Sequence, residues 1–248
     1  MIKGMSTHVE DLKFRLMVVD LLRAAKRTYT YRELANKTGL PVTVLSRYAK
    51  GHVLPNNERA RKLCKVLNKL VGLEVVLQKK IRFNSDGYFD NTEIIGDFNI
   101  LRQAANKALD TFAGKRVTKV LTAAVDGIPL ATMVSNYLGV DLAIAKRSKE
   151  VGVSEFLEET YVLSNSGVTM TLYLPKHALK RRDSVLMVDD MVKTGETQMA
   201  LINLVKKAKA EISGAFFLLA IGDEWRKKIN LPANCPIKVI SQVYPPNR

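Results

Sequence analysis

The sequence predicts an α/β protein in two parts: an all-helical helix-turn-helix domain over residues 1–72, then a parallel-sheet domain over residues 73–248. Apolar residues recur at helical spacing in the first part, whereas strand-length apolar runs alternate with helical segments in the second. Residues 1–80 hold 17 Lys and Arg against 6 Asp and Glu, a net charge of +11, and the rest contributes only +4 of the total of +15. A basic first part indicates an anionic partner, although a basic surface also serves solubility.

In the first part, two amphipathic helices flank a shorter pair. Leu12, Leu16 and Val19 recur at helical spacing in the first of them. Gly39 can adopt the left-handed conformation of a tight turn, and Pro41 is suited to open the next helix. The predicted helices cover residues 11–24, 31–37, 41 to about 51, and 56–70. We therefore expect a helix, a tight turn and a second helix over a shared core.

This segment resembles the five-helix repressor family that includes phage repressors and Cro, over roughly residues 10–70. The resemblance implies that double-stranded DNA is the partner and that the second short helix enters the major groove. Arg47 is the best candidate for reading a base, because an arginine can bind O6 and N7 of guanine together. A helical adaptor that binds protein is the alternative, but the charge of +11 favours a phosphate backbone. The implied DNA-binding residues are Val42, Thr43, Ser46 and Arg47 at the groove, with Lys50 and His52 nearer the phosphates.

The second part alternates strands and helices in the manner of a parallel α/β sheet. We expect strands at residues 117–124, 140–145, 184–188, 214–221 and 237–241, and helices at 129–138 and 197–208. Residues 161–174 read as a two-stranded excursion with residues 165–167 as its turn. No apolar stretch is long enough to cross a membrane, the start of the chain does not read as a signal peptide, and the two cysteines lack metal-ligand spacing. These features predict a cytoplasmic protein without a membrane partner.

The most informative stretch is residues 184–197, SVLMVDDMVKTGET. Asp189 and Asp190 follow an apolar run at the point where we expect the strand to leave the sheet, which is where open α/β sheets bind ligands. The carboxylates can accept hydrogen bonds from vicinal ribose hydroxyls. The following residues supply a glycine, hydroxyls and the N–H groups of a helix start, which suit a phosphate. This phosphate loop consists of Lys193, Thr194, Gly195, Glu196 and Thr197; an ordinary helix cap and turn is the alternative reading.

The whole pattern resembles the phosphoribosyl pyrophosphate (PRPP) signature of type I phosphoribosyltransferases, and the resemblance extends over roughly residues 85–245, closest to the purine branch. It implies a PRPP ligand, with magnesium held by Asp189 and Asp190 indirectly, through PRPP. It places a pyrophosphate loop at residues 124–129, including Asp126 and Gly127. It also assigns Lys146 and Arg147 to the pyrophosphate and residues 161–174 to a loop that closes over the ligand. The alternative for residues 124–129 is an ordinary strand-to-helix turn. The alternative for Lys146 and Arg147 is a run of solvated charges.

Three departures from the purine enzymes favour a sensor over an active transferase. Asp126 stands where adenine phosphoribosyltransferases usually carry a basic residue, and it would repel pyrophosphate unless it turned away or bound magnesium. Ser164 stands where a carboxylate follows the Tyr-x-Leu sequence, and a hydroxyl cannot replace it in moving a proton at neutral pH. Glu196 replaces a frequent glycine in the phosphate loop. The sequence does not identify a nucleobase. The aromatic residues that could stack on a purine are Phe83, Tyr88, Phe89, Phe98 and Trp225.

The sequence therefore predicts a transcriptional regulator in which a phosphoribosyltransferase-like domain senses PRPP and controls operator binding, with a purine base or nucleotide as a second candidate ligand. The genes would belong to purine or nucleotide metabolism, and we expect a homodimer reading two half-sites. Two alternatives remain open: an active purine phosphoribosyltransferase with a DNA-binding appendage, and a DNA-binding module whose second domain is only a dimerisation scaffold.

Overall fold

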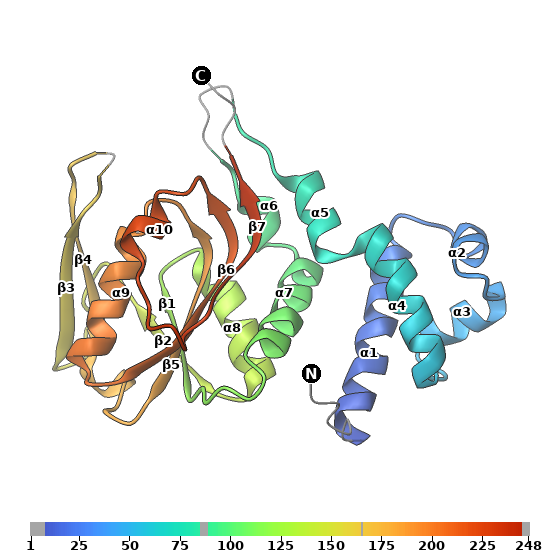
Figure 1. The fold of residues 1–248 in the computed structure, drawn as a ribbon, viewed down its shortest axis with the longest axis horizontal. Coiled ribbons are helices and arrows are strands. Elements are labelled where there is room, and N and C mark those ends of the chain that lie inside the picture. Colours follow the sequence, from blue (N-terminus) through green and yellow to red (C-terminus); the bar gives the residue numbers. More distant parts are fainter. Residues whose placement is uncertain (1–7, 85–88, 165, 245–248) are drawn as a thin grey trace. The chain divides into compact units, whose positions relative to one another are not determined.

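The computed structural model describes residues 8–84, 89–164 and 166–244 (Figure 1). The chain divides into two compact units, Met1–Lys79 and Lys80–Arg248. The sequence-predicted boundary at residues 72/73 lies where α5 (Leu73–Lys80) begins, and that helix runs up to the division. Among the described residues, no helix is both long and apolar enough to cross a membrane.

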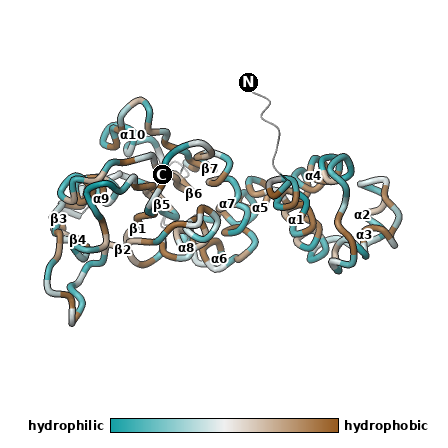
Figure 2. Tube along the Cα trace, turned by 90° about the horizontal axis from the view of Figure 1, so that it is seen from below, coloured by the Kyte–Doolittle hydropathy of each residue, from teal (hydrophilic) through white to brown (hydrophobic). Residues whose placement is uncertain are grey.

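The first unit is a small bundle of α1 (His8–Ala25), α2 (Tyr31–Thr38), α3 (Val42–Ala49) and α4 (Asn57–Val71). Along these helices hydrophilic and hydrophobic residues alternate (Figure 2), as expected for amphipathic helices with one buried face. Leu12 and Leu16 of α1 are nevertheless exposed, whereas Val19 is buried. The fully buried centre comprises Val18, Leu22, Leu34, Leu45 and Leu67.

Local chemistry sets the ends of α2 and α3. Thr30 and Glu33 form a capping box, in which each side chain accepts a hydrogen bond from the other's backbone N–H. Gly39 ends α2 with φ of +70°, and its N–H donates to the carbonyl of Ala35. Pro41 then precedes α3. The predicted helix, tight turn and helix are confirmed to within one or two residues at each end.

The second unit contains a parallel sheet in the order β2-β1-β5-β6-β7. The strands are β1 (Lys119–Ala123), β2 (Asp141–Ala145), β5 (Ser184–Val192), β6 (Glu211–Ile221) and β7 (Ile237–Val243). The helices are α6 (Thr92–Ile95), α7 (Phe98–Thr111), α8 (Gly127–Leu138), α9 (Glu196–Lys207) and α10 (Trp225–Lys228). The chain runs outward from β1 to β2 and in the other direction from β5 to β7. The order therefore reverses between β1 and β5, which is the switch point where such sheets bind ligands.

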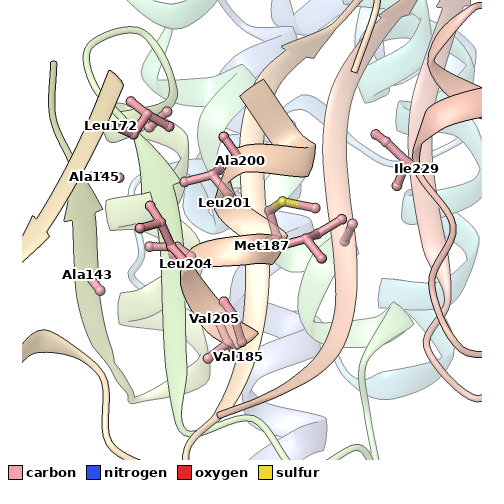
Figure 3. Close-up of a cluster of buried hydrophobic side chains, with 14 of the residues drawn as sticks. Ala143, Ala145, Leu172, Val185, Met187, Ala200, Leu201, Leu204, Val205 and Ile229 are labelled. Carbon is pink, nitrogen blue, oxygen red and sulfur yellow. The ribbon is translucent and has the colours of Figure 1, made fainter. Parts of the chain in front are cut away.

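Helices cover both faces of this sheet: α7 and α8 lie on one side and α9 on the other (Figure 1). Figure 3 shows the side under α9, where Leu201, Leu204 and Val205 lie over Val185 and Met187 of β5. Both faces of β5 are buried, which explains why its sequence is almost continuously apolar rather than alternating. This packing fixes the position of the loop between β5 and α9.

The predicted two-stranded excursion is an antiparallel ribbon of β3 (Phe156–Val162) and β4 (Thr169–Pro175). It pairs outside the main sheet and packs beside α9. Asn165, part of the predicted turn, lies outside the described residues, and Gly167 has the positive φ of +67° that a turn glycine permits. A 3₁₀ turn, η1 (Lys176–Ala178), follows β4.

Several predicted ends were wrong by a few residues. Helix α8 begins at Gly127 rather than residue 129, and β6 begins at Glu211 rather than residue 214. The largest difference concerns β5, which continues to Val192 instead of ending at residue 188. Met191 and Val192 still pair with Leu219 and Ala220 of β6, so the two aspartates belong to the strand.

Candidate functional site

Asp189 and Asp190 lie on β5 beside the switch point, and both are buried at 6% exposure. The prediction that they follow the strand end was wrong, because the ladder to β6 continues past them. Gln198 of α9 donates from Nε2 to Asp189 Oδ2 at 2.9 Å. Asn91, just before α6, donates from Nδ2 to Asp190 Oδ2 at 2.6 Å. Neither amide was identified from the sequence, because a single Asn or Gln carries no motif.

The loop after β1 lies directly against this carboxylate pair. A Cβ atom on Gly127 would lie 2.3 Å from both Asp189 Oδ1 and Thr122 Oγ1, so only glycine fits. The Ala124 N–H donates to the carbonyl of Ala145 at 2.8 Å, and the peptide bond between Ala124 and Val125 is cis. The structure thus brings together the predicted pyrophosphate loop and the carboxylate pair, 62 residues apart in sequence between Gly127 and Asp189.

Electrostatics set the carboxylate pair apart from ordinary surface acids. Burial raises the pKa of Asp189 well above its usual value, and the charge of Asp190 raises it further. Burial also raises the pKa of Asp190; the hydrogen bond from Asn91 opposes this, while the charge of Asp126 adds to it. This concentration of negative charge favours hydroxyl donors or a cation in the neighbourhood of the pair.

The described side chains at this site do not form a set of metal ligands by themselves. Within the described ranges, no cluster of three or more His, Cys, Asp or Glu residues is arranged to hold a metal ion. Asp189 and Asp190 instead use part of their capacity on Gln198 and Asn91. The residues therefore fit an ion brought in by a phosphorylated ligand better than an ion held by the protein alone.

The predicted phosphate loop lies between β5 and α9. Gly195 has φ of +87°, and a Cβ there would approach Trp225 Cα to 3.3 Å and Ile229 Cγ1 to 3.2 Å. Helix α9 starts at the next residue, so its first N–H groups face the loop. Lys193 is exposed, and Thr197 Oγ1 lies 3.3 Å from the hydroxyl of Tyr161 on the ribbon.

Glu196 is almost fully buried at the start of α9. Its carboxylate accepts hydrogen bonds from the hydroxyls of Thr194 and Ser164 and pairs with the ammonium of Lys228. Burial opposes its ionisation, but the hydrogen bonds from Lys228, Ser164 and Thr194 outweigh burial and lower the pKa of Glu196 to about 2. Sequence reasoning had noted Glu196 and Ser164 separately as departures and had missed Lys228, which lies in a short basic run without a motif.

The other side chains predicted to bind pyrophosphate are exposed or pair with other residues. Lys146 follows β2; its backbone bridges to Tyr173 of the ribbon, and its side chain pairs with Glu150. Arg147 and Asp126 are exposed. The assignment of these side chains to the pyrophosphate stays a prediction.

The aromatic candidates for stacking lie in different surroundings. Trp225 is buried: its Nε1 donates to the Gly222 carbonyl at 3.1 Å, its ring meets Phe217 edge-on, and its backbone lies against Gly195 of the phosphate loop. Phe83 and Phe89 pack on each other with centroids 5.6 Å apart. Phe98 is 56% exposed beneath the guanidinium of Arg102, and Tyr88 lies outside the described residues.

The first unit presents its own candidate interface on α3. Leu45 and Tyr48 point into the core, which leaves the opposite side of the helix for a partner. The groups beside α3 are also fixed: Arg23 Nε donates to the Ala49 carbonyl at 2.7 Å, and the N–H of His52 to the Arg47 carbonyl at 3.0 Å. The exposed predicted residues are Val42, Thr43, Arg47, Lys50 and His52, with Ser46 partly exposed.

Comparison with known families agrees with this architecture. Residues 91–247 match the phosphoribosyl transferase domain, which is more than half of the chain, and residues 21–71 match a helix-turn-helix domain. The chain belongs to the phosphoribosyl transferase domain family. The predicted resemblance and fold class are therefore confirmed.

Individual relatives fall into two kinds. The chain is 31% identical over 128 residues to the purine biosynthesis transcriptional repressor PurR of Bacillus subtilis, covering 52% of this chain and 45% of the repressor. It is 28% identical over 143 residues to xanthine phosphoribosyltransferase of Lactococcus lactis, covering 54% of this chain and 73% of that protein. The chain spans about half the length of the curated repressors it matches. Among solved structures, adenine phosphoribosyltransferase of Rhodothermus marinus superposes with a TM-score of 0.60 at 29% identity, over 69% of this chain and 98% of that one.

Proposed function

We propose that this protein is a DNA-binding transcriptional regulator whose phosphoribosyltransferase-like unit senses PRPP with magnesium and controls operator binding. The observation that carries the proposal is that the loop after β1, the buried carboxylate pair and the start of α9 lie together in a chain that also has a helix-turn-helix unit. Similarity to PurR repressors of purine biosynthesis supports genes of purine or nucleotide metabolism as its targets.

Each part of the site has a role in this proposal. Asp189 and Asp190 accept the vicinal hydroxyls of ribose, with Gly127 leaving room for the carboxylates. The loop from Lys193 to Thr197 and the start of α9 bind the sugar's phosphate. Asp126, Gly127, Lys146 and Arg147 face the pyrophosphate and its magnesium. On α3, Arg47 with Val42, Thr43 and Ser46 reads bases, and Lys50 and His52 contact phosphates.

Ser164 favours a sensor over a transferase. It lies next to the phosphate loop, where it hydrogen-bonds to Glu196, and it offers no carboxylate for proton transfer. The regulator acts as a cytoplasmic homodimer, so that ligand binding changes the spacing of two recognition helices. A tenfold change in operator affinity requires only about 1.4 kcal/mol of differential PRPP binding between the two arrangements.

The intact carboxylate pair and the similarity to xanthine phosphoribosyltransferases favour one second candidate, an active purine phosphoribosyltransferase. Calorimetric titration of the protein with PRPP and magnesium, followed in the same sample by assay of pyrophosphate release with adenine, guanine, hypoxanthine and xanthine, separates the two. Binding without release establishes a sensor. Release with one base establishes the enzyme, and absence of binding rejects both.

A further inference from the structure

Glu196 is held by groups from three separate segments of the second unit. Thr194 precedes it in the phosphate loop, Ser164 follows the ribbon strand β3, and Lys228 ends α10. The Ser164 N–H also points at the carboxylate, at 3.4 Å, and Lys228 Nζ donates to Ser164 Oγ at 2.8 Å. The backbone N–H of Glu196 itself adds a further donor at the start of α9. One buried carboxylate thus receives hydroxyl, ammonium and backbone donors together.

This set of donors is the one that phosphate groups use in proteins. Helix-start N–H groups, hydroxyls and a lysine ammonium together bind a phosphate oxygen through charge-assisted hydrogen bonds. Here the carboxylate of Glu196 satisfies them instead. A phosphate entering the loop between Thr194 and Thr197 would need the same Thr194 hydroxyl and the same helix start.

We propose that Glu196 is an internal ligand of the phosphate loop, which the phosphate of an incoming sugar phosphate displaces, and that Lys228 then binds that phosphate. This inference rests on the phosphate site of the proposed function, but not on the identity of the sugar phosphate or on DNA binding. Because the pKa of Glu196 is lowered to about 2, the carboxylate stays charged at any physiological pH. A competing anion, rather than a proton, releases it.

Displacement has a structural consequence for the ribbon. Ser164 is attached to Glu196 through both its backbone and its hydroxyl, and Tyr161 reaches Thr197. When the carboxylate leaves the loop, Ser164 loses this partner, and the contact between Tyr161 and Thr197 is what remains. Glu196 therefore couples the filling of the phosphate loop to the freedom of the ribbon beside it.

Calorimetry on the full chain tests the competition. Ribose 5-phosphate and PRPP with magnesium are titrated into the wild type, Glu196→Gln and a matched control, Glu211→Gln. Glu211 is exposed at the amino end of β6, and its substitution by Gln removes the same charge from the same unit. Glu196→Gln should bind both probes about tenfold more tightly, because a like charge no longer competes with the phosphate. The control should match the wild type.

Two further variants identify the roles of the partners. Adding Lys228→Met to Glu196→Gln should remove most of the gain, because the ammonium that would bind the phosphate is then absent. Ser164→Ala weakens the hold on Glu196 without changing the charge of the loop, so it should give a smaller gain. Hydrogen exchange of residues 156–164 should accelerate in Glu196→Gln and stay unchanged in Glu211→Gln.

The outcomes separate this inference from the proposed function. Equal or weaker binding by Glu196→Gln, with wild-type binding of PRPP, overturns the internal ligand and leaves the sensor intact. Tighter binding of ribose 5-phosphate by Glu196→Gln supports the internal ligand even if DNA binding ignores PRPP. Absence of binding of either probe by every variant rejects both.

Discussion

Gly127 has no room for a side chain, because Thr122 and Asp189 occupy the position of its Cβ. Both neighbours are buried, so neither can move aside cheaply. We expect Gly127→Ala to lower the free energy of unfolding by about 1–3 kcal/mol, as overpacking does. Urea denaturation measures this. Gly96→Ala is the matched control, because its φ is −84° and its nearest neighbour, the Thr92 carbonyl oxygen, lies at 3.2 Å; equal losses in the two variants would contradict the account.

Asp189 makes stability depend on pH in a defined direction. Its folded pKa is raised, so the folded protein binds more protons than the unfolded chain above the ordinary value of 3.8. The free energy of unfolding contributed by this group therefore falls as pH rises through the raised pKa. Asp189→Asn should remove that fall. Denaturation of both proteins from pH 4 to 8 measures the difference, and parallel curves would count against a raised pKa.

At the scale of helices and strands, sequence reasoning succeeded where the determinants are local. The ends of α2 and α3 follow from Thr30, Glu33, Gly39 and Pro41, which act on backbone groups within a few residues. The carboxyl end of β5 was placed too early because two charged residues usually end a buried strand. Its length depends on β6, more than twenty residues further along the chain.

The site was predicted in part for the same reason. The phosphate loop and the carboxylate pair form one continuous motif and could be read directly. Asn91 and Lys228 lie far from that motif in the sequence, and only the fold brings them to it. Gln198 directly follows the motif, but a single glutamine does not reveal which carboxylate it binds.

Helix α3 makes separate predictions for base and phosphate contacts. Arg47→Ala should cost about 1–3 kcal/mol of operator binding and relax sequence preference at one base position, because the arginine reads a base. Lys50→Ala should weaken binding to all sequences alike and reduce the slope of log affinity against log salt by about one, because the lysine neutralises a phosphate. Fluorescence anisotropy with the operator and single-base variants, at several salt concentrations, measures both. A uniform loss from Arg47→Ala would assign it to the backbone instead.

For the whole molecule, the charge division now has a structural basis. The helical unit with α3, Met1–Lys79, holds 16 Lys and Arg against 6 Asp and Glu, a net charge of +10, whereas the more nearly balanced remainder contains the carboxylate pair. A basic unit suits an anionic duplex through counterion release. Linkage between the units requires only that PRPP prefer one arrangement of the protein over another.

Operator affinity with and without PRPP is the measurement that tests this account most directly. The operator is first selected from genomic fragments, and its affinity is measured across saturating PRPP with magnesium for the wild type and for Asp189→Asn/Asp190→Asn. The account predicts about a tenfold or larger change for the wild type and none for the double variant, which lacks the charges that bind ribose. The same affinity at every PRPP concentration in the wild type would contradict it.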